Sequence, residues 1–174
     1  MYVAAQIAGG FLGGVIVWLT YLPHWKETPD PTTKLAVFST TPAIRQFGAN
    51  VISELIGGFV LVLALLAVLS PSNFVPGSDL AKGFGPVLVG VIVMAIGLSL
   101  GGPTGYAINP ARDFGPRLFT SVAGWGSEVF RAGNGWWWVP IVAPCIGGIV
   151  GGWVYDACIG HHFPDRRAAV RAEA

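Results

Sequence analysis

Four stretches of the chain carry almost no charge over the length that a helix needs to cross a bilayer. They span residues 2–22, 47–69, 84–101 and 136–155, and Glu54 is the single charged residue within them. At about 1.5 Å per residue, a helix of each length covers most or all of the ~30 Å apolar core of a bilayer. The pattern therefore predicts an all-α membrane protein with four spanning helices, whose surroundings are the lipid bilayer.

Aromatic residues and composition agree with this prediction. Trp18, Tyr21 and Trp25 lie near one end of the first run, and the three tryptophans 136–138 open the last, so we expect these rings at the headgroup level. The 174 residues are 53% hydrophobic and 11% charged, with a net charge of +1, and the mean hydropathy is +0.62. The sequence has no dense basic patch of the kind that binds nucleic acid. No nucleophile–base set or metal-ligand cluster indicates an enzyme, a metal or a cofactor, and Cys145 and Cys158 are interpreted as packing residues.

A polar segment, residues 101–117, separates the third and fourth runs. Its first part is rich in Gly and Pro, which resist helix formation. Asn109 is a favourable N-cap and Pro110 suits the first helical position, so we expect a helix from here to near Gly124. That helix is too short to cross a bilayer. Because open backbone survives at membrane depth only where it lines water or lies within protein, the sequence predicts a re-entrant loop followed by a half-helix.

The chemistry of this segment suits a narrow polar passage. The Asn109 amide and the half-helix N-terminus would present donors and a partial positive charge. The carbonyls of residues 105–108 would offer acceptors, Arg112 a fixed charge, and Tyr106 an apolar ring face with a polar edge. A solute passing such a site must donate and accept in turn and must not be a cation. A solvated loop is the alternative for Arg112 and Asp113, in which Asp113 compensates the helix dipole and pairs with Arg117 at i, i+4.

Glu54 lies inside an otherwise apolar run. An acid at this depth costs about 2.5–3.5 kcal/mol on insertion scales unless it faces protein or water. We therefore expect Glu54 to face inward.

Two of the runs share a glycine pattern. Gly9-Gly10-x-x-Gly13-Gly14 in the first resembles Gly147-Gly148-x-x-Gly151-Gly152 in the last. Both patterns suit close helix packing. They also suit two homologous halves, each ending in such a helix, as in proteins built from inverted repeats. On that interpretation residues 45–160 form a complete second half and the first half is represented by its last helix alone.

The segment Gly-Pro-Thr-Gly-Tyr-Ala-Ile-Asn-Pro-Ala-Arg-Asp-Phe-Gly-Pro-Arg, residues 102–117, closely resembles the second Asn-Pro-Ala loop of the major intrinsic protein (aquaporin) family, in its aquaglyceroporin or glycerol-facilitator branch. The resemblance extends through residues 4–6, residues 37–42, the Glu54 helix and the last helix. It implies a passive channel for glycerol and related small neutral solutes, with water as a further permeant, and for a full-length chain a homotetramer in the plasma membrane.

The resemblance also assigns roles to individual residues. Asn109, Pro110 and Ala111 match the signature motif, whereas Tyr106 and Arg112 match the selectivity filter, with Tyr106 at a position where glycerol channels often carry Phe. The pore-lining carbonyls would be those of Gly105, Tyr106, Ala107 and Ile108. Asp113 matches the acid that separates glycerol channels from water-only relatives, and Glu54 matches a glutamate that supports the loop.

The chain departs from the family in one respect, since the family has two Asn-Pro-Ala motifs and this sequence has one. The resemblance implies that residues 1–22 are the last helix of the first repeat, 23–44 an extracellular loop, 45–160 the second repeat and 161–174 a cytoplasmic tail. About 80–90 in-frame residues upstream that contain an Asn-Pro-Ala would favour a misassigned start over a natural short form. A truncated, non-conducting membrane protein is the alternative, and a secondary transporter is disfavoured because Glu54 is the one acid at mid-membrane.

Overall fold

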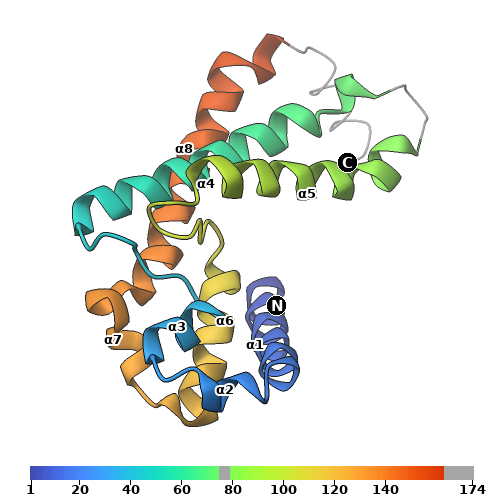
Figure 1. Ribbon diagram of the computed structural model, residues 1–174. Helices are drawn as coiled ribbons and strands as arrows, with labels where there is room; N and C mark the ends of the chain where they lie inside the picture. The colour runs from blue at the N-terminus through green and yellow to red at the C-terminus, as the bar shows by residue number, and fades with distance from the viewer. Residues whose placement is uncertain (75–78, 163–174) are drawn as a thin grey trace.

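The computed structural model of the chain describes residues 1–74 and 79–162, and every regular element in these ranges is helical (Figure 1). Its four long helices are α1 (Tyr2–Thr20), α4 (Phe47–Val68), α5 (Leu80–Leu100) and α8 (Val139–Cys158). All four are long and apolar enough to cross a membrane. The prediction of an all-α protein with four spanning helices is therefore confirmed.

Shorter helices lie between the long ones. They are α2 (His24–Glu27), α3 (Pro31–Ala36), α6 (Pro110–Thr120) and α7 (Glu128–Gly135). The segment expected as a loop over residues 23–44 thus contains two short helices. Asp30 explains the second of them, because its carboxylate accepts from the backbone N–H groups of Thr32 and Thr33 and caps α3. The tail beyond residue 162 lies outside the described residues.

Several helix boundaries differ from those expected. The helix α5 begins at Leu80, one turn before the apolar run, because a helix continues into polar residues where solvent can reach them. The half-helix α6 ends at Thr120 and continues as a wider π-helical turn, Ser121–Trp125, to a kink at Gly124. The residues Trp136–Trp138 form a 3₁₀ turn, so α8 begins at Val139 instead of Trp136.

The structure shows the burial of the aromatic and cysteine side chains singled out from the sequence. Trp136 is buried and packs against Val139 and Ala143, so it is a core residue; Trp138 in the same turn is exposed, as expected of a headgroup residue. Cys145 and Cys158 are both exposed on α8, so they do not pack in the interior of the described chain. Sequence position alone could not separate these faces, because α8 is apolar nearly all round.

Glycines bring α8 close to α4. A methyl group added to Gly147 would overlap the carbonyl of Leu55, and one added to Gly151 would lie 2.6 Å from the carbonyl of Phe59. On the other side, Gly58 of α4 faces the backbone of Pro144. The small residues therefore let two helix backbones approach, which is the packing role expected for the glycine pattern of the last run.

The first glycine pattern packs against the half-helix. An added methyl at Gly10 would lie 2.7 Å from the carbonyl oxygen of Ala111, and one at Gly115 would lie 2.9 Å from Gly10 Cα. Pro116 inside α6 borders the same crossing, with its Cδ 3.3 Å from the methyl position of Gly10. Gly14 faces the same helix, because an added methyl there would lie 2.9 Å from Phe119 Cδ1, whereas Gly9 and Gly13 have no neighbouring element of the described chain within 4 Å of theirs.

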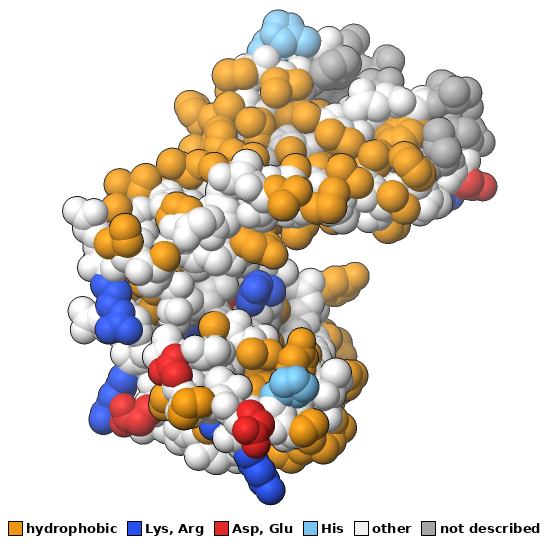
Figure 2. All heavy atoms as spheres, in the orientation of Figure 1, with side chains coloured by type: hydrophobic (Ala, Val, Ile, Leu, Met, Phe, Trp, Pro, Cys, Tyr) orange, Lys and Arg blue, Asp and Glu red, His pale blue; other side chains and the backbone are white. Residues whose placement is uncertain are grey.

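The helices form two groups joined by the polar segment (Figure 1). One group contains α4, α5 and most of α8; the other contains α1 and α6 with the short helices α2, α3 and α7. Hydrophobic side chains cover the visible face of the first group, whereas Lys, Arg, Asp and Glu gather at the far end of the second (Figure 2). The loop before α6 lies where the two groups meet, and it carries the candidate site.

Candidate functional site

The site begins at the N-terminus of α6. The side-chain oxygen of Asn109 accepts from the backbone N–H groups of Ala111, at 2.9 Å, and Arg112, at 3.3 Å. Pro110 follows at the first helical position, where its missing N–H costs nothing. Because the cap uses only the oxygen of Asn109, both N–H donors of the amide group stay available to another partner. The partial positive charge of the helix end lies at the same place.

The loop before this helix has an unusual backbone. Gly105, Tyr106 and Ile108 all have positive φ, at 78°, 41° and 41°. Such values are uncommon for residues with a side chain and are least favourable for a β-branched residue such as Ile108. Strain of this kind persists only where the surroundings impose it.

Glu54 of α4 imposes it. Its Oε1 accepts from the Thr104 hydroxyl at 2.6 Å and from the Ala107 N–H at 2.9 Å, and its Oε2 accepts from the Ile108 N–H at 2.8 Å. Glu54 is completely buried, as expected for the one acid in its run. One turn further along α4, Gly57 leaves room for the Ile108 side chain, because an added methyl there would lie 2.6 Å from Ile108 Cγ2.

These hydrogen bonds set the direction of the loop carbonyls. In a trans peptide the N–H and the C=O of the same unit point in opposite directions, and no peptide bond within residues 1–74 and 79–162 is cis. Since the N–H groups of Ala107 and Ile108 point at Glu54, the carbonyls of Tyr106 and Ala107 point away from it. Two successive acceptors therefore face the side of the loop opposite α4.

Tyr106 and Arg112 lie next to each other. The guanidinium carbon of Arg112 is 6.0 Å from the centre of the Tyr106 ring, at the outer limit of a cation–π contact. Both side chains are exposed in the described chain. The Tyr106 ring rests on Gly97 of α5 and on Gly101, directly after that helix, where added methyl groups would lie 3.0 Å and 2.8 Å from its atoms.

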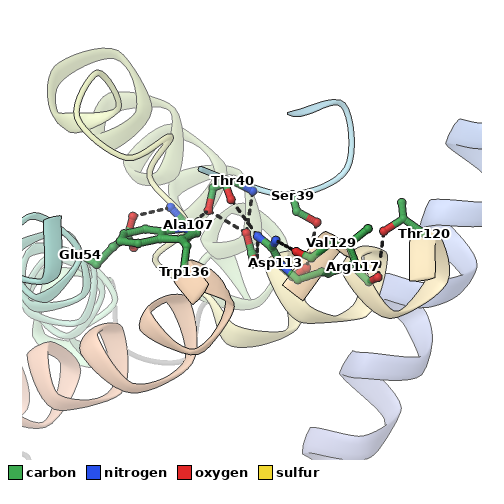
Figure 3. Close-up of polar contacts among 9 residues, drawn as sticks. All are labelled: Ser39, Thr40, Glu54, Ala107, Asp113, Arg117, Thr120, Val129 and Trp136. Carbon is green, nitrogen blue, oxygen red and sulfur yellow. Dashed lines mark hydrogen bonds and ion pairs between the residues drawn. The ribbon is translucent and has the colours of Figure 1, made fainter. Parts of the chain in front are cut away.

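Asp113 faces the other way and is completely buried with Arg117 (Figure 3). Its Oδ1 is 2.9 Å from Arg117 Nη2, and Arg117 Nε donates to the same oxygen at 2.9 Å. The pairing at i, i+4 that the sequence left open is thus present, but it lies in the protein interior and not in a solvated loop. Arg112 is exposed on the open face of α6, which fits both a solvated side chain and the predicted filter role.

The segment 38–42 completes this buried network. Thr40 donates from its backbone N–H and its hydroxyl to Asp113 Oδ2, at 2.6 Å and 2.7 Å. Arg117 donates to the carbonyls of Thr40, at 2.8 Å, and Val129, at 2.7 Å. The indole N–H of Trp136 donates to the Thr40 hydroxyl at 3.2 Å. Sequence reasoning missed Thr40 and Trp136, since nothing local indicates partners 73 and 96 residues away.

A metal site has no support in residues 1–74 and 79–162, where no three His, Cys, Asp or Glu side chains group closely enough to hold an ion.

Comparison with known proteins decides the family. The model of the family described as "Major intrinsic protein" matches residues 1–155. The chain belongs to the major intrinsic protein family. It is an integral membrane protein, and the family predicted from the loop motif is confirmed.

Curated members of this family include close relatives of the chain. It is 51% identical over 157 residues to the probable glycerol uptake facilitator protein of Thermotoga maritima, which covers 89% of the chain and 63% of the relative. It is 48% identical over 165 residues to the glycerol uptake facilitator protein of Bacillus subtilis, which covers 93% of the chain and 56% of the relative. These names place the similarity in the glycerol-facilitator branch. The chain spans about 60% of the length of these relatives.

A solved member of the major intrinsic protein family supports the fold. The X-ray structure of the aquaglyceroporin from Plasmodium falciparum matches with a TM-score of 0.78 and 32% identity, over 91% of the chain and 63% of that structure. The predicted fold, the C-terminal part of an aquaporin-like bundle with four spanning helices and one half-helix, is confirmed by this match.

Proposed function

We propose that the chain forms part of a passive transmembrane channel for glycerol and related small neutral solutes, with water as a further permeant. The observation that carries this proposal is the orientation of the loop carbonyls. Glu54 takes the N–H groups of Ala107 and Ile108, so successive carbonyl acceptors face the opposite side, directly before the donors of Asn109. A solute with several hydroxyl groups can exchange hydrogen bonds along such a row without losing them all at once.

Some residues of the site contact the solute, and others keep those residues in position. Asn109, followed by Pro110 and Ala111, supplies donors at the helix end, and the carbonyls of residues 105–108 supply acceptors. Tyr106 and Arg112 form the filter, in which the ring contacts the carbon side of a polyol and the guanidinium donates to its hydroxyls. Glu54 and Asp113 support the loop and the half-helix from the protein side.

Exclusion of cations follows from the same parts. Arg112 carries a fixed positive charge, and the N-terminus of α6 adds a partial one of the same sign. A cation entering here would lose part of its hydration and meet repulsion, whereas a neutral polyol would not. The site thus favours solutes without charge and is proposed to perform no chemical reaction on them.

The arrangement of the whole protein belongs to this proposal. Residues 1–22 are the last helix of the first repeat, 23–44 an extracellular loop, 45–160 the second repeat and 161–174 a cytoplasmic tail. The channel lies in the plasma membrane with its C-terminus in the cytoplasm, and full-length chains assemble as a homotetramer. The names of the relatives in the glycerol-facilitator branch and the exposed apolar helices support this arrangement.

The test is solute uptake by a channel in which this chain is completed at its N-terminus by the corresponding segment of the Thermotoga maritima relative. We expect facilitated glycerol uptake, and Arg112→Ala should raise proton leak and admit larger polyols. A unit charge about 4 Å away contributes roughly 4 kcal/mol at an effective dielectric constant of about 20. Loss of about a third of that barrier changes flux about tenfold.

Arg131→Ala is the matched control, because Arg131 is an exposed arginine whose partner is Glu128 at the surface. It should leave both measurements unchanged. Stopped-flow uptake of polyols and a pH-sensitive dye inside the vesicles provide the readouts. The filter assignment is wrong if Arg112→Ala keeps the wild-type selectivity for both protons and polyols.

A further inference from the structure

We infer that Thr40 is a positioning residue that sets the separation between the two filter residues, Tyr106 and Arg112. This inference rests on the proposed channel function for its effect on selectivity, but its structural part can be tested without transport. Thr40 lies in the segment between α3 and α4, and its own side chain is nearly inaccessible to solvent. Thr40 is thus far in sequence from the loop and the half-helix that carry the filter residues, but it lies next to both of them in the structure.

The first contact is with the carbonyl loop. A methyl group added to Gly105 would lie 3.2 Å from Thr40 Cγ2 and 3.4 Å from Thr40 Cβ. Gly105 directly precedes Tyr106 and has a φ of 78°. The methyl group of Thr40 therefore bounds the space in which the strained start of this loop can lie.

The second contact is with the half-helix. The Thr40 hydroxyl donates to Asp113 Oδ2 at 2.7 Å and accepts from the Trp136 indole at 3.2 Å (Figure 3). Successive residues of a helix point about 100° apart. Holding Asp113 against Thr40 therefore fixes the rotation of the first turn of α6, and this rotation directs Arg112 to the open face.

Together the contacts make Thr40 a spacer between two elements. One side of the residue meets the backbone next to Tyr106, and the other side binds the neighbour of Arg112. The distance between the Tyr106 ring and the Arg112 guanidinium depends on both. Ala43 strengthens the same segment, because its N–H donates to the Pro103 carbonyl at 3.0 Å. A change at Thr40 should consequently alter the filter although Thr40 contacts no solute.

Thr40→Val and Thr40→Ser separate the two contacts. Valine keeps a methyl group against Gly105 but loses the hydroxyl, which leaves the Trp136 N–H without an acceptor and Asp113 with one donor fewer. Serine keeps the hydroxyl and loses the methyl group. Thr33→Val is the matched control, because it also removes a hydroxyl that donates to an aspartate, at 2.6 Å from Asp30, but at an exposed position on α3.

The first measurement is amide hydrogen exchange of the 174-residue chain in lipid nanodiscs. Loss of a buried hydrogen bond that leaves a donor unpaired should speed exchange of residues 105–113 about tenfold in Thr40→Val. Exchange in α4 and α8 should not change, and Thr33→Val should resemble the wild type. Thr40→Ser loses only the methyl group against Gly105, so it should speed exchange at residues 105–106 and leave residues 109–113 unchanged. If Thr40→Val does not accumulate, Thr40→Ala removes the same hydroxyl with a smaller side chain and is judged by the same criteria.

The second measurement is the uptake ratio of glycerol to a five-carbon polyol in the completed channel, corrected for protein in the membrane. Thr40→Val should lower this ratio about threefold or more, a barrier change of roughly 0.7 kcal/mol. Thr40→Ser should lower it less, because serine keeps the hydroxyl bond to Asp113 and loses only the methyl group. Unchanged exchange in Thr40→Val, or equal effects of valine and serine, would overturn the inference. If the wild-type channel carries no glycerol, the proposed function fails, and the exchange experiment alone decides the role of Thr40.

Discussion

At the scale of single residues, the buried carboxylates of Glu54 and Asp113 hold different parts of the site, and each does so by accepting several hydrogen bonds. Glu54 comes from a long apolar helix and binds a loop that lies between two helices and belongs to neither. Asp113 comes from the half-helix and binds a second segment, through Thr40 and Arg117. Each acid is costly to bury alone and favourable once its oxygens accept several bonds. The strained loop and the acid that holds it therefore depend on each other.

Tyr106 gives a test at this scale. Replacing it with leucine removes the flat ring face and the hydroxyl but keeps an apolar side chain over Gly97 and Gly101. We expect Tyr106→Leu to change the glycerol-to-water permeability ratio of the completed channel about threefold to tenfold, or roughly 0.7–1.4 kcal/mol in relative barrier.

Tyr106→Phe keeps the ring and serves as the control, with a ratio closer to that of the wild type. Light-scattering measurements of water and glycerol flux, normalised to channel density, give the ratio. Tyr106 would be a packing residue if Tyr106→Leu reduced the amount of channel but left the ratio of the surviving channels unchanged.

At the scale of elements, glycines decide where helices and side chains meet. Gly147 and Gly151 bring α8 to α4, Gly10 and Gly115 bring α1 to α6, and Gly97 gives the Tyr106 ring its place on α5. The last of these joins packing to the proposed selectivity. Because Gly97 has no side chain, the backbone of α5 lies directly behind the ring of Tyr106, the aromatic residue of the proposed filter.

Gly97→Ala should therefore narrow the site. Its methyl group would lie 3.0–3.3 Å from three ring atoms of Tyr106, which moves the ring away from α5. We expect lower uptake of larger polyols with little loss of stability, because alanine favours a helix by about 1 kcal/mol over glycine. Gly90→Ala in the same helix has nothing within 4 Å and should change neither; equal uptake profiles for the two variants would contradict the prediction.

The cap of α3 should depend on pH. Hydrogen bonds from the Thr33 hydroxyl, and then from the backbone N–H groups of Thr33 and Thr32, lower the pKa of Asp30 below 3.8. A depressed folded-state pKa contributes stability that is complete above the unfolded value and is lost as pH falls through the folded value. We expect α3 to loosen only in acid below about pH 3.8. The amide shift of Thr33 would report it, and Asp30→Asn should show no such titration.

The spanning helices were predictable because apolar runs of this length have few alternatives in a membrane. The start of α6 was predictable because Asn109 and Pro110 are local signals for a helix N-terminus, and the burial of Glu54 followed from the cost of an acid at that depth. The partners of Thr40 were not, since a threonine in a polar segment can be satisfied by water as well as by Asp113. The burial of Trp136 was not predictable either, because an indole suits both a headgroup region and a core.

At the scale of the whole molecule, the open side of the site is the main feature. Tyr106 and Arg112 are exposed, while their supporting residues, Glu54 and Asp113, are completely buried. On the proposed function, the described helices therefore form one wall of the channel and the structure behind that wall. A water-filled path at membrane depth needs protein on all sides, and the relatives are longer than this chain.

We expect the 174 residues alone to conduct no glycerol. Two copies inserted in the same direction cannot supply a wall of opposite orientation, so self-association does not replace it. Vesicles that contain only this chain, at a verified amount, should take up glycerol no faster than empty vesicles. Uptake above that level, blocked by Arg112→Trp, would show that copies of the chain close the path by themselves.

The bonds between Glu54 and the loop also impose an order on biosynthesis. Glu54 precedes Ala107 and Ile108 by 53 and 54 residues. At roughly 5–20 residues per second, the ribosome needs about 3–10 s to add the intervening residues. During that time the carboxyl group has none of its loop donors and is costly to leave in lipid. We therefore expect α4 to gain the contacts that stabilise Glu54 only when the loop arrives, several seconds after the helix itself has been made.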